Sequence, residues 1–414
     1  MHEIEKNTLP ASFMDDHDRL ALAEIESFVK MYGRDSRLVR LMFALRRLRN
    51  RVLRDTLQKW VYRAPRVCAD KLNILLHLRG GFGDACGAYL LIRALRSKLP
   101  DAVLYVYTDT PGAARAFLDG EKNVVFLDQK TKWRAYDLAA EVCHSVKFTH
   151  VDRKRFEEKA PDFLPVLDRA CERQCEFAFF LEDNYLLEDA LGRFLFHRGL
   201  QRLDLQSYLS GLDFDAKAYP LLPAELTAAS RLKRFGLDGK KYITFHDGIN
   251  GEVRLSGGQR PLKCWPRSRW RELAVLIKKT YPGVLLVQLG GPNSRRFDFT
   301  DVCLLGKTEW KDLPSLLEHA LVHVDGDSGL VQLSRYLSVR CAVLFGPTDA
   351  HYFGLSKNMN LGADVCGRCM WVKGTCWHTA CVLGHESCRN MEEVTVERVF
   401  DAVRTLFRAQ KISL

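Results

Sequence analysis

From about residue 70 onward, short apolar runs alternate with stretches of helical periodicity. Leu72 to Leu78 is apolar, a glycine cluster follows, Ala88 to Leu99 has a helical pattern, and Val103 to Tyr107 is apolar again. Strand, turn, helix and strand in this order predict a βαβ unit, which places the two strands in one parallel sheet. Later apolar runs at 124–127 and 177–181 extend this region less clearly.

A second series of the same kind begins near Tyr242. Its strand candidates are Tyr242 to His246, Val284 to Leu289, Leu321 to Val324 and Cys341 to Phe345, with helical stretches between them. A polar segment around Pro220 to Gly236 separates the two series. We therefore predict an α/β protein with two Rossmann-like, doubly wound domains that face each other across a cleft.

The chain before these series is strongly basic and looks helical. Its apolar positions are spaced for one helix face, and arginines surround them; the apolar positions are Leu38, Leu41, Leu45, Leu48 and Val52. Residues 33–66 contain eleven Lys or Arg and two Asp, a net charge of +9. Such a helix can pack on the body of the protein, dock on an anionic membrane or bind nucleic acid, and we keep all three interpretations open.

These patterns divide the chain into four parts. We place a helical extension at 1–68, two Rossmann-like domains at 69–225 and 226–390, and a C-terminal helix at 391–414. Hydrophobic residues at 47% and charged residues at 27% are typical of globular proteins and exclude fibrous or mainly disordered classes. No apolar run reaches the roughly 18 residues that span a bilayer, and no secretory signal is recognisable, so we expect a cytoplasmic location.

The formal charge of +11 suits a partner rich in phosphate, and three loops offer chemistry for one. In the first loop, Gly80, Gly81 and Gly83 lead to Asp84. The glycines do not fit the dinucleotide fingerprint G-x-G-x-x-G, although Asp109 ends the next strand. Asp84 is either a first-turn acid that stabilises the following helix or a carboxylate that acts as a general base.

The second and third loops lie in the second series. Lys263 stands just before a helix, where it is either a surface lysine or a partner for a diphosphate. Asp327 can accept hydrogen bonds from sugar hydroxyls, and the Ser328 hydroxyl with the N–H groups of Gly329 and Leu330 can hold a phosphate. The plain alternative is a D-S-G turn in which Asp327 caps a helix.

Taken in order, these loops resemble glycosyltransferase family nine, the ADP-heptose-dependent heptosyltransferases. The resemblance rests on Gly83-Asp84, on Lys263-Cys264-Trp265-Pro266, on Asp327-Ser328-Gly329-Leu330 and on Phe345-Gly346-Pro347-Thr348-Asp349. It extends from about Leu72 to the C-terminus. It implies a GT-B fold in which the second domain holds the nucleotide sugar and the first holds the acceptor.

The resemblance also implies roles for individual residues. Asp84 matches the catalytic base and Lys263 the lysine that faces the donor phosphates. Asp327 matches the acid that binds the heptose, and the diphosphate lies at Ser328, Gly329 and Leu330. Gln332 stands where the family commonly has histidine, so this position can donate a hydrogen bond but carries no charge. The implied reaction is an inverting displacement that uses no cofactor.

Five cysteines fall within 23 residues, which favours metal ligation in a reducing compartment. Cys366, Cys369, Cys381 and Cys388 are similar to a four-cysteine pattern in a subset of the family that binds iron; that resemblance leaves Cys376 as the spare. A structural iron or zinc ion is therefore expected, and His378 keeps a different ligand set open. Unligated thiols or a disulfide are the alternatives.

The expected activity is heptose transfer from ADP-heptose to a hydroxyl acceptor, the inner core of lipopolysaccharide, with the basic helix at the inner membrane. The alternative acceptor is an autotransporter-like polypeptide, which the cysteine cluster favours. A nucleic-acid-binding protein with a metal ribbon is a distant alternative, because it leaves the three loops unexplained. A catalytically inactive family member is also possible. The oligomeric state stays open.

Overall fold

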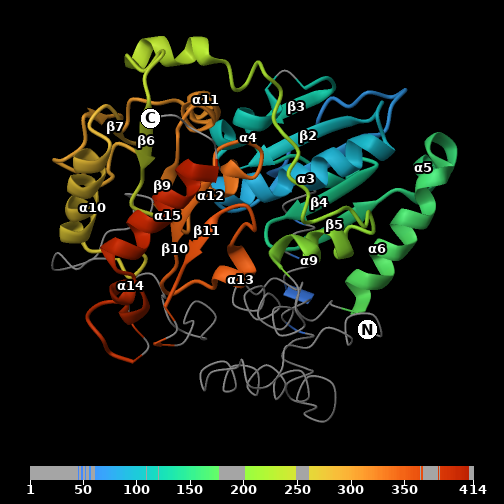
Figure 1. Ribbon diagram of the computed structural model, residues 1–414. Coiled ribbons are helices and arrows are strands. Elements are labelled where there is room, and N and C mark those ends of the chain that lie inside the picture. The colour runs from blue at the N-terminus through green and yellow to red at the C-terminus, as the bar shows by residue number, and fades with distance from the viewer. Residues whose placement is uncertain are drawn as a thin grey trace. The chain divides into compact units, whose positions relative to one another are not determined.

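The computed structural model describes residues 61–108, 110–119, 121–176, 201–248, 261–363, 365–366, 381 and 383–409, and also Leu45, Leu48, Arg49, Val52 and Thr56 (Figure 1). The chain forms two compact units, and the main boundary between them along the sequence lies between Ala218 and Tyr219. Each unit carries one sheet. No helix in the described part of the chain is long and apolar enough to cross a membrane.

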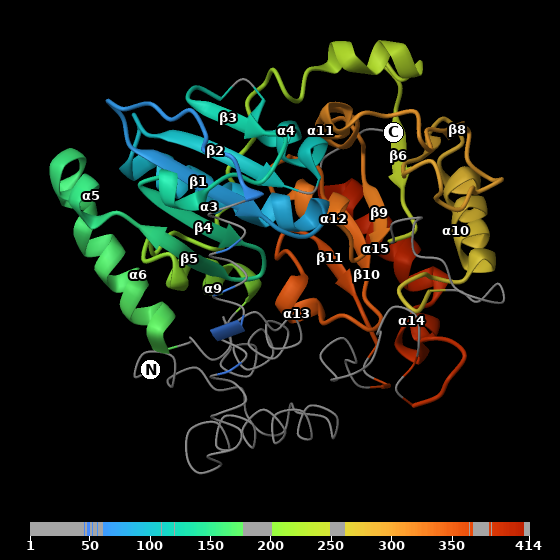
Figure 2. The same ribbon diagram turned by 180° about the vertical axis from the view of Figure 1, so that it is seen from behind.

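The first unit holds a five-stranded sheet in the order β3-β2-β1-β4-β5 (Figure 2). Its strands are β1 (Asn73–Leu78), β2 (Val103–Thr108), β3 (Val124–Leu127), β4 (Leu138–Val142) and β5 (Val146–Val151). The first four are parallel, and β5 returns antiparallel to β4. The helices are α3 (Phe82–Lys98), α4 (Pro111–Leu118), α5 (Arg153–Lys159), α6 (Leu164–Glu176) and α9 (Arg202–Leu209). The predicted parallel βαβ unit is thus confirmed.

The first helix of this unit differs from the prediction in where it begins. The sequence pattern starts a helix near Ala88, whereas α3 begins at Phe82, directly after the glycine turn. Asp84 therefore lies in the first helical turn rather than in a loop before the helix. The apolar run at 177–181 and Asp109 lie outside the described residues.

The second unit holds a six-stranded, fully parallel sheet in the order β11-β10-β9-β6-β7-β8. Its strands are β6 (Tyr242–Phe245), β7 (Leu285–Gln288), β8 (Val302–Cys303), β9 (His323–Gly326), β10 (Cys341–Leu344) and β11 (Met359–Leu361). The helices are α10 (Arg267–Thr280), α11 (Leu313–Glu318), α12 (Gly329–Ser334), α13 (Ala350–Phe353), α14 (Arg389–Glu393) and α15 (Val396–Ala409). The four predicted strands and their parallel arrangement are confirmed.

Both sheets reverse their strand order next to the first strand. The chain leaves β1 toward β2 and β3 and returns to its other side at β4; it leaves β6 toward β7 and β8 and returns at β9. In open α/β sheets, ligands bind beyond the carboxyl ends of the strands at such a switch point. The topology therefore marks two edges, one after β1 and β4 and one after β6 and β9.

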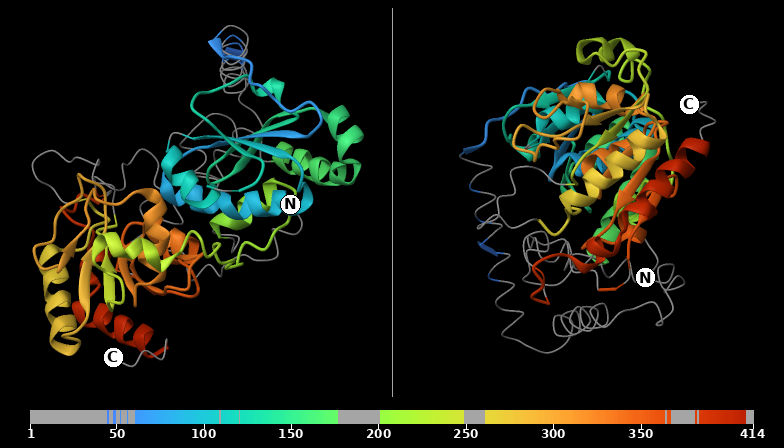
Figure 3. Two further views of the ribbon diagram at one scale, coloured as in Figure 1. Left: turned by 90° about the horizontal axis from the view of Figure 1, so that it is seen from above. Right: turned by 60° about the vertical axis from the view of Figure 1, so that its left-hand side comes forward.

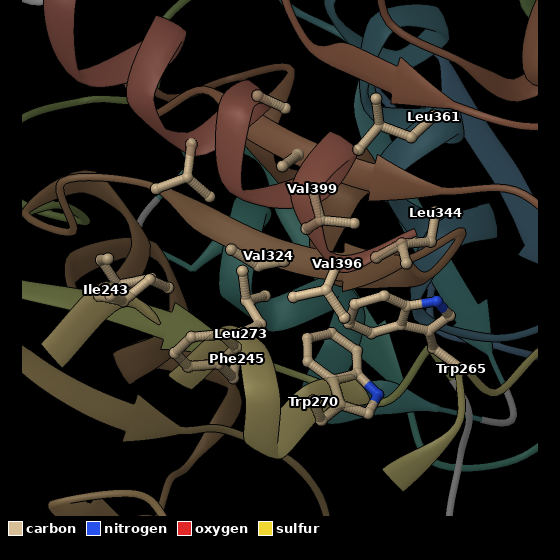
Figure 4. Close-up of a cluster of buried hydrophobic side chains, with 14 of the residues drawn as sticks. Ile243, Phe245, Trp265, Trp270, Leu273, Val324, Leu344, Leu361, Val396 and Val399 are labelled. Carbon is tan, nitrogen blue, oxygen red and sulfur yellow. The ribbon is translucent and has the colours of Figure 1, made fainter. Parts of the chain in front are cut away.

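Two tryptophans anchor the second unit's core (Figure 4). Trp265 and Trp270 pack edge to face with ring centroids 5.2 Å apart, and Phe245 of β6 lies 5.8 Å from Trp270. The Trp265 indole N–H donates to the carbonyl of Val394 (2.8 Å). Helix α15 packs beside α10 (Figure 3), where the rings of Tyr281 and Phe407 are 5.0 Å apart. This packing fixes the chain that leads from Lys263 into α10.

Most of the predicted basic helix lies outside the described residues. The five residues that are described there are helical, and the apolar side chains Leu45, Leu48 and Val52 are 54–56% exposed. Three exposed apolar positions do not distinguish packing from membrane docking, so both interpretations stay predictions.

Candidate functional site

At the β1 edge, the glycine turn is shaped around the Asp84 carboxylate. Gly80 has φ = +94°, and a side chain there would overlap that carboxylate. The backbone N–H of Gly81 donates to Asp84 Oδ2 at 2.7 Å. Asp84 is therefore a first-turn acid that accepts from the residue before α3, which is the structural role foreseen for it. This bond occupies one carboxylate oxygen.

The other carboxylate oxygen faces two basic side chains. Arg202, from the start of α9, donates to Asp84 Oδ1, and Nε2 of His144 lies 3.5 Å from the same oxygen. The Asp84 side chain is 18% exposed. Burial raises the pKa of Asp84, but Arg202, His144 and the Gly81 N–H together outweigh it and hold that pKa well below its usual range. The carboxylate is therefore ionised and partly accessible.

Asp84, Cys143 and His144 are also close enough together to be considered as a metal site, because their ligand atoms lie within 4.8 Å of one another. The guanidinium of Arg202 already pairs with Asp84. A cation placed on this carboxylate would be repelled by the positive charge of Arg202. The charge of Arg202 therefore disfavours a metal ion at this cluster.

At the β6 edge, the structure brings together two of the residues singled out in the sequence. Lys263 Nζ lies 3.4 Å from Asp327 Oδ2, and their side chains are only 15% and 10% exposed. Gly248 and Gly326 let the backbones approach closely, because a Cβ on Gly248 would lie 2.9 Å from the Gly326 Cα. Lys263 is thus a largely buried, paired lysine and not a free surface residue.

The serine and glutamine of the predicted donor site have structural partners. Ser328 Oγ accepts from the N–H of Leu330 (3.1 Å) and donates to Asp325, so Ser328 caps α12, and not Asp327 as the plain D-S-G interpretation expects. Gly329 begins α12. The Gln332 amide donates to the carbonyl of Phe353 (3.1 Å). Asp327 and Lys263 are consequently the charged side chains of the predicted donor set.

Sequence reasoning missed four polar residues at these edges. Arg202 and His144 contact Asp84 from distant parts of the chain, while Asp325 and His246 are hydrogen-bonded to each other (2.9 Å) at the β6 edge. His144 and His246 each come just after a strand, which is a usable signal. Arg202 carries no local signal, because 118 residues separate it from Asp84.

Three of the four predicted metal-binding cysteines are described. The pKa of the buried Cys388 thiol is raised, mainly by burial, and the N–H groups of Met391 and Asn390 donate to it. Cys366 and Cys381 are close enough to affect the same pKa. Asn390 holds Cys366 through two hydrogen bonds, each of 2.8 Å, between its amide and the Cys366 backbone. Cys369, Cys376 and His378 lie outside the described residues.

Comparison with known proteins adds a family and a fold. Residues 253–367 match the family model of glycosyltransferase family 9 (heptosyltransferase). No curated protein matches the chain by sequence. Among solved structures, the iron-containing dodecameric glycosyltransferase TibC of enterotoxigenic E. coli is similar, at 14% identity and a TM-score of 0.52, over 82% of this chain and 78% of that one. Its complex with ADP-D-β-D-heptose matches at 12% identity and a TM-score of 0.50, over 82% and 77%.

E. coli ADP-heptose LPS heptosyltransferase II is also similar, at 15% identity and a TM-score of 0.49, over 82% of this chain and all of that chain. At such identities, the likeness to TibC establishes the fold alone, and the family match covers only residues 253–367. Residues 253–367 therefore match a glycosyltransferase family 9 domain, and the chain has the two-sheet α/β, GT-B-like fold of TibC.

Proposed function

We propose that this enzyme transfers a heptose from ADP-heptose to a hydroxyl acceptor, with inversion at the anomeric carbon. The observation that carries the proposal is the ionised Asp84 carboxylate at the β1 switch point, held by Arg202 and the Gly81 N–H. The paired Lys263 and Asp327 at the β6 switch point support a sugar-diphosphate site there.

In this mechanism, Asp84 takes the proton of the acceptor hydroxyl while the hydroxyl oxygen attacks the anomeric carbon. The new carbon–oxygen bond forms as the bond to the diphosphate breaks, and ADP leaves with the electron pair. Lys263 meets the charge that grows on the leaving group, and Asp327 binds the sugar hydroxyls.

Arg202 is expected to set the acid limit of the reaction. Because it is the main opposing influence to burial, Arg202→Gln should raise the pKa of Asp84, and the carboxylate should then be lost at a higher pH. The acid limb of the plot of kcat/KM against pH should move to higher pH. Below the pKa of Asp84, kcat/KM should fall about tenfold per pH unit. Arg202→Lys should restore most of the limb.

The matched control is Arg153→Gln, because Arg153 pairs with Asp168 in the same unit but is 54% exposed. Its pH profile should equal that of the unmodified enzyme. If Arg202→Gln lowers the rate by the same factor at every pH, Arg202 does not act through the ionisation of Asp84.

The acceptor we propose is the inner core of lipopolysaccharide, and the enzyme would act in the cytoplasm with its basic N-terminal segment at the inner membrane. The +9 charge of residues 33–66 supports contact with phosphorylated lipid. A polypeptide of the autotransporter type is the second candidate acceptor, favoured by the cysteine cluster. Gln332, engaged by Phe353, leaves the donor site with less charge than the family pattern.

The direct test supplies purified enzyme with ADP-heptose and either core lipopolysaccharide or an autotransporter passenger polypeptide. Mass spectrometry of the products should show one added heptose on one of the two acceptors. UDP-glucose and GDP-mannose serve as matched donors. Transfer from one of these sugars, with none from ADP-heptose, would contradict the proposed donor.

We also infer that the cysteines hold a structural metal ion. Cys366 and Cys381 are close enough to Cys388 to raise the pKa of its thiol, and backbone N–H groups that donate to a sulfur suit a thiolate ligand. Together with Cys369 they provide four thiolates, a set that holds iron or zinc tetrahedrally. When bound, the metal would supply a cross-link for the chain around α14 and no step of the transfer.

Elemental analysis of the purified protein is expected to find about one iron or zinc ion per chain. Cys388→Ser should lose that metal and lower the unfolding temperature, because the ligated form is stabilised by metal binding. Cys264→Ser is the control, since Cys264 is also buried but donates to the Asp247 carbonyl at the β6 edge. Protein that is free of metal at full stability would rule the site out.

A further inference from the structure

A buried network at the β6 switch point is unused by the mechanism above. The Asp325 side chain, on β9, is fully buried and accepts from three side chains. His246 Nδ1 lies 2.9 and 3.1 Å from its two oxygens, His323 Nε2 lies at 3.1 Å, and the Ser328 hydroxyl donates to it. A carboxylate without access to water requires such partners, and one of them must carry the balancing charge.

The two histidines differ in how deeply they are buried. His323 is fully buried, and its Nδ1 lies 2.9 Å from Thr244 Oγ1. A neutral His323 satisfies both contacts, with Nε2–H donating to Asp325 and Nδ1 accepting from the threonine hydroxyl. A second proton would place a full charge in the core.

His246 is the better place for the charge. Its side chain is 12% exposed, and its Nδ1 faces both oxygens of Asp325. The Gly248 N–H lies 3.3 Å from the same nitrogen, a longer contact than the carboxylate pair. Within the described residues, Nε2 of His246 has no hydrogen-bond partner. A proton on Nε2 would thus point one charged N–H away from Asp325.

The charges around His246 come from three segments. Burial and the charge of Lys263 lower its pKa, whereas Asp325 of β9 and Asp247 beside it raise it, and the net pKa is above the ordinary value. Asp247 itself is buried, accepts from the Trp270 indole N–H (3.1 Å) and has its pKa raised to about 6. A proton on His246 would therefore add a positive charge near Lys263 at the same switch point.

We propose that His246 is a diphosphate-binding residue, whose protonated imidazole donates Nε2–H to a phosphate oxygen of the nucleoside diphosphate at the β6 edge. Asp325 and His323 are positioning residues that fix the ring. The inference rests on the proposed function, since it assigns a contact to the same donor. Because charge on the departing diphosphate grows during transfer, this hydrogen bond strengthens as the reaction proceeds.

The test is calorimetric binding of ADP alone, from about pH 7 to about pH 9.5, a range in which the phosphates of ADP are already ionised. For the unmodified enzyme, affinity should fall about tenfold per pH unit once His246 loses its proton, and binding should take up protons from the buffer. His246→Gln should bind ADP about ten to a hundred times more weakly at the lower pH and lose this dependence. His319→Gln is the control, because His319 is exposed at the end of α11.

The assignment is overturned if the affinity of the unmodified enzyme for ADP does not change with pH. It is also overturned if His246→Gln keeps the same pH dependence of ADP affinity. The unmodified protein answers the question alone if the variant does not fold. Absence of any ADP binding would overturn the proposed donor and this contact together, whereas ADP binding without proton uptake overturns only the role of His246. Heptose transfer is measured separately, so the two failures are distinguishable.

Discussion

Asp84→Asn is expected to lower kcat for heptose transfer by about 10² to 10⁴-fold, because the amide cannot take the proton of the acceptor hydroxyl. ADP binding should stay within about twofold, since the proposed diphosphate site belongs to the second unit's sheet. The amide can still accept the Gly81 N–H through its oxygen, so the start of α3 should be preserved. Steady-state rates and calorimetric ADP binding check both halves of the prediction.

The control for this variant is Asp312→Asn. Asp312 also accepts a backbone N–H three residues earlier (Glu309, 2.7 Å) and also pairs with an arginine, Arg234, but it lies between β8 and α11. Asp312→Asn therefore reproduces the structural loss without touching the β1 edge. If the two variants lower kcat equally, Asp84 is a structural acid and the base must be sought elsewhere.

Lys263→Met should lower kcat/KM for ADP-heptose by about 10² to 10³-fold, a loss of roughly 3 to 4 kcal/mol of transition-state stabilisation. The substitution removes the positive charge at position 263, and Asp327, only 10% exposed, loses its ion-pair partner. ADP affinity should also fall, because part of the charge that Lys263 meets is already present in the ground state. Initial rates at several donor concentrations give the ratio directly.

Lys311→Met is the comparison for this effect. Lys311 pairs with Glu309 at 2.8 Å, but both side chains are about half exposed, so the pair contributes little. The rate should not change measurably. Should Lys263→Met leave kcat/KM within a factor of two, the charge on the leaving group is met by another residue, and Lys263 serves only to hold Asp327.

The sequence predicted those parts of the fold that depend on local periodicity. The runs that became β1, β2, β6, β9 and β10 are apolar enough to be recognised as buried strands, and the helices between them imply parallel pairing. Strands β8 and β11 have two and three residues, too few for any periodicity to register. The start of α3 was missed because its first turn follows three glycines within four residues, a composition that disfavours a helix.

The residues of the candidate site likewise divide into those that a local motif predicts and those that only the folded chain brings together. Asp84, Lys263 and Asp327 stand in recognisable motifs, and the structure pairs the last two. The partner of Asp84 cannot be read locally, because Arg202 reaches it only when α9 and α3, far apart in sequence, meet at one sheet edge. The dual nature of Asp84, part helix acid and part accessible carboxylate, likewise emerges only from its two differently occupied oxygens.

The most direct measurement is amide hydrogen exchange of the full protein with and without ADP-heptose. Donor bound at the second sheet's switch point should slow exchange in the segments that follow β6 and β9, around Gly248 and Asp327, and His246→Gln should weaken that protection. Exchange that is unchanged in both segments but slowed elsewhere in the chain would contradict the placement of the sugar diphosphate at this edge.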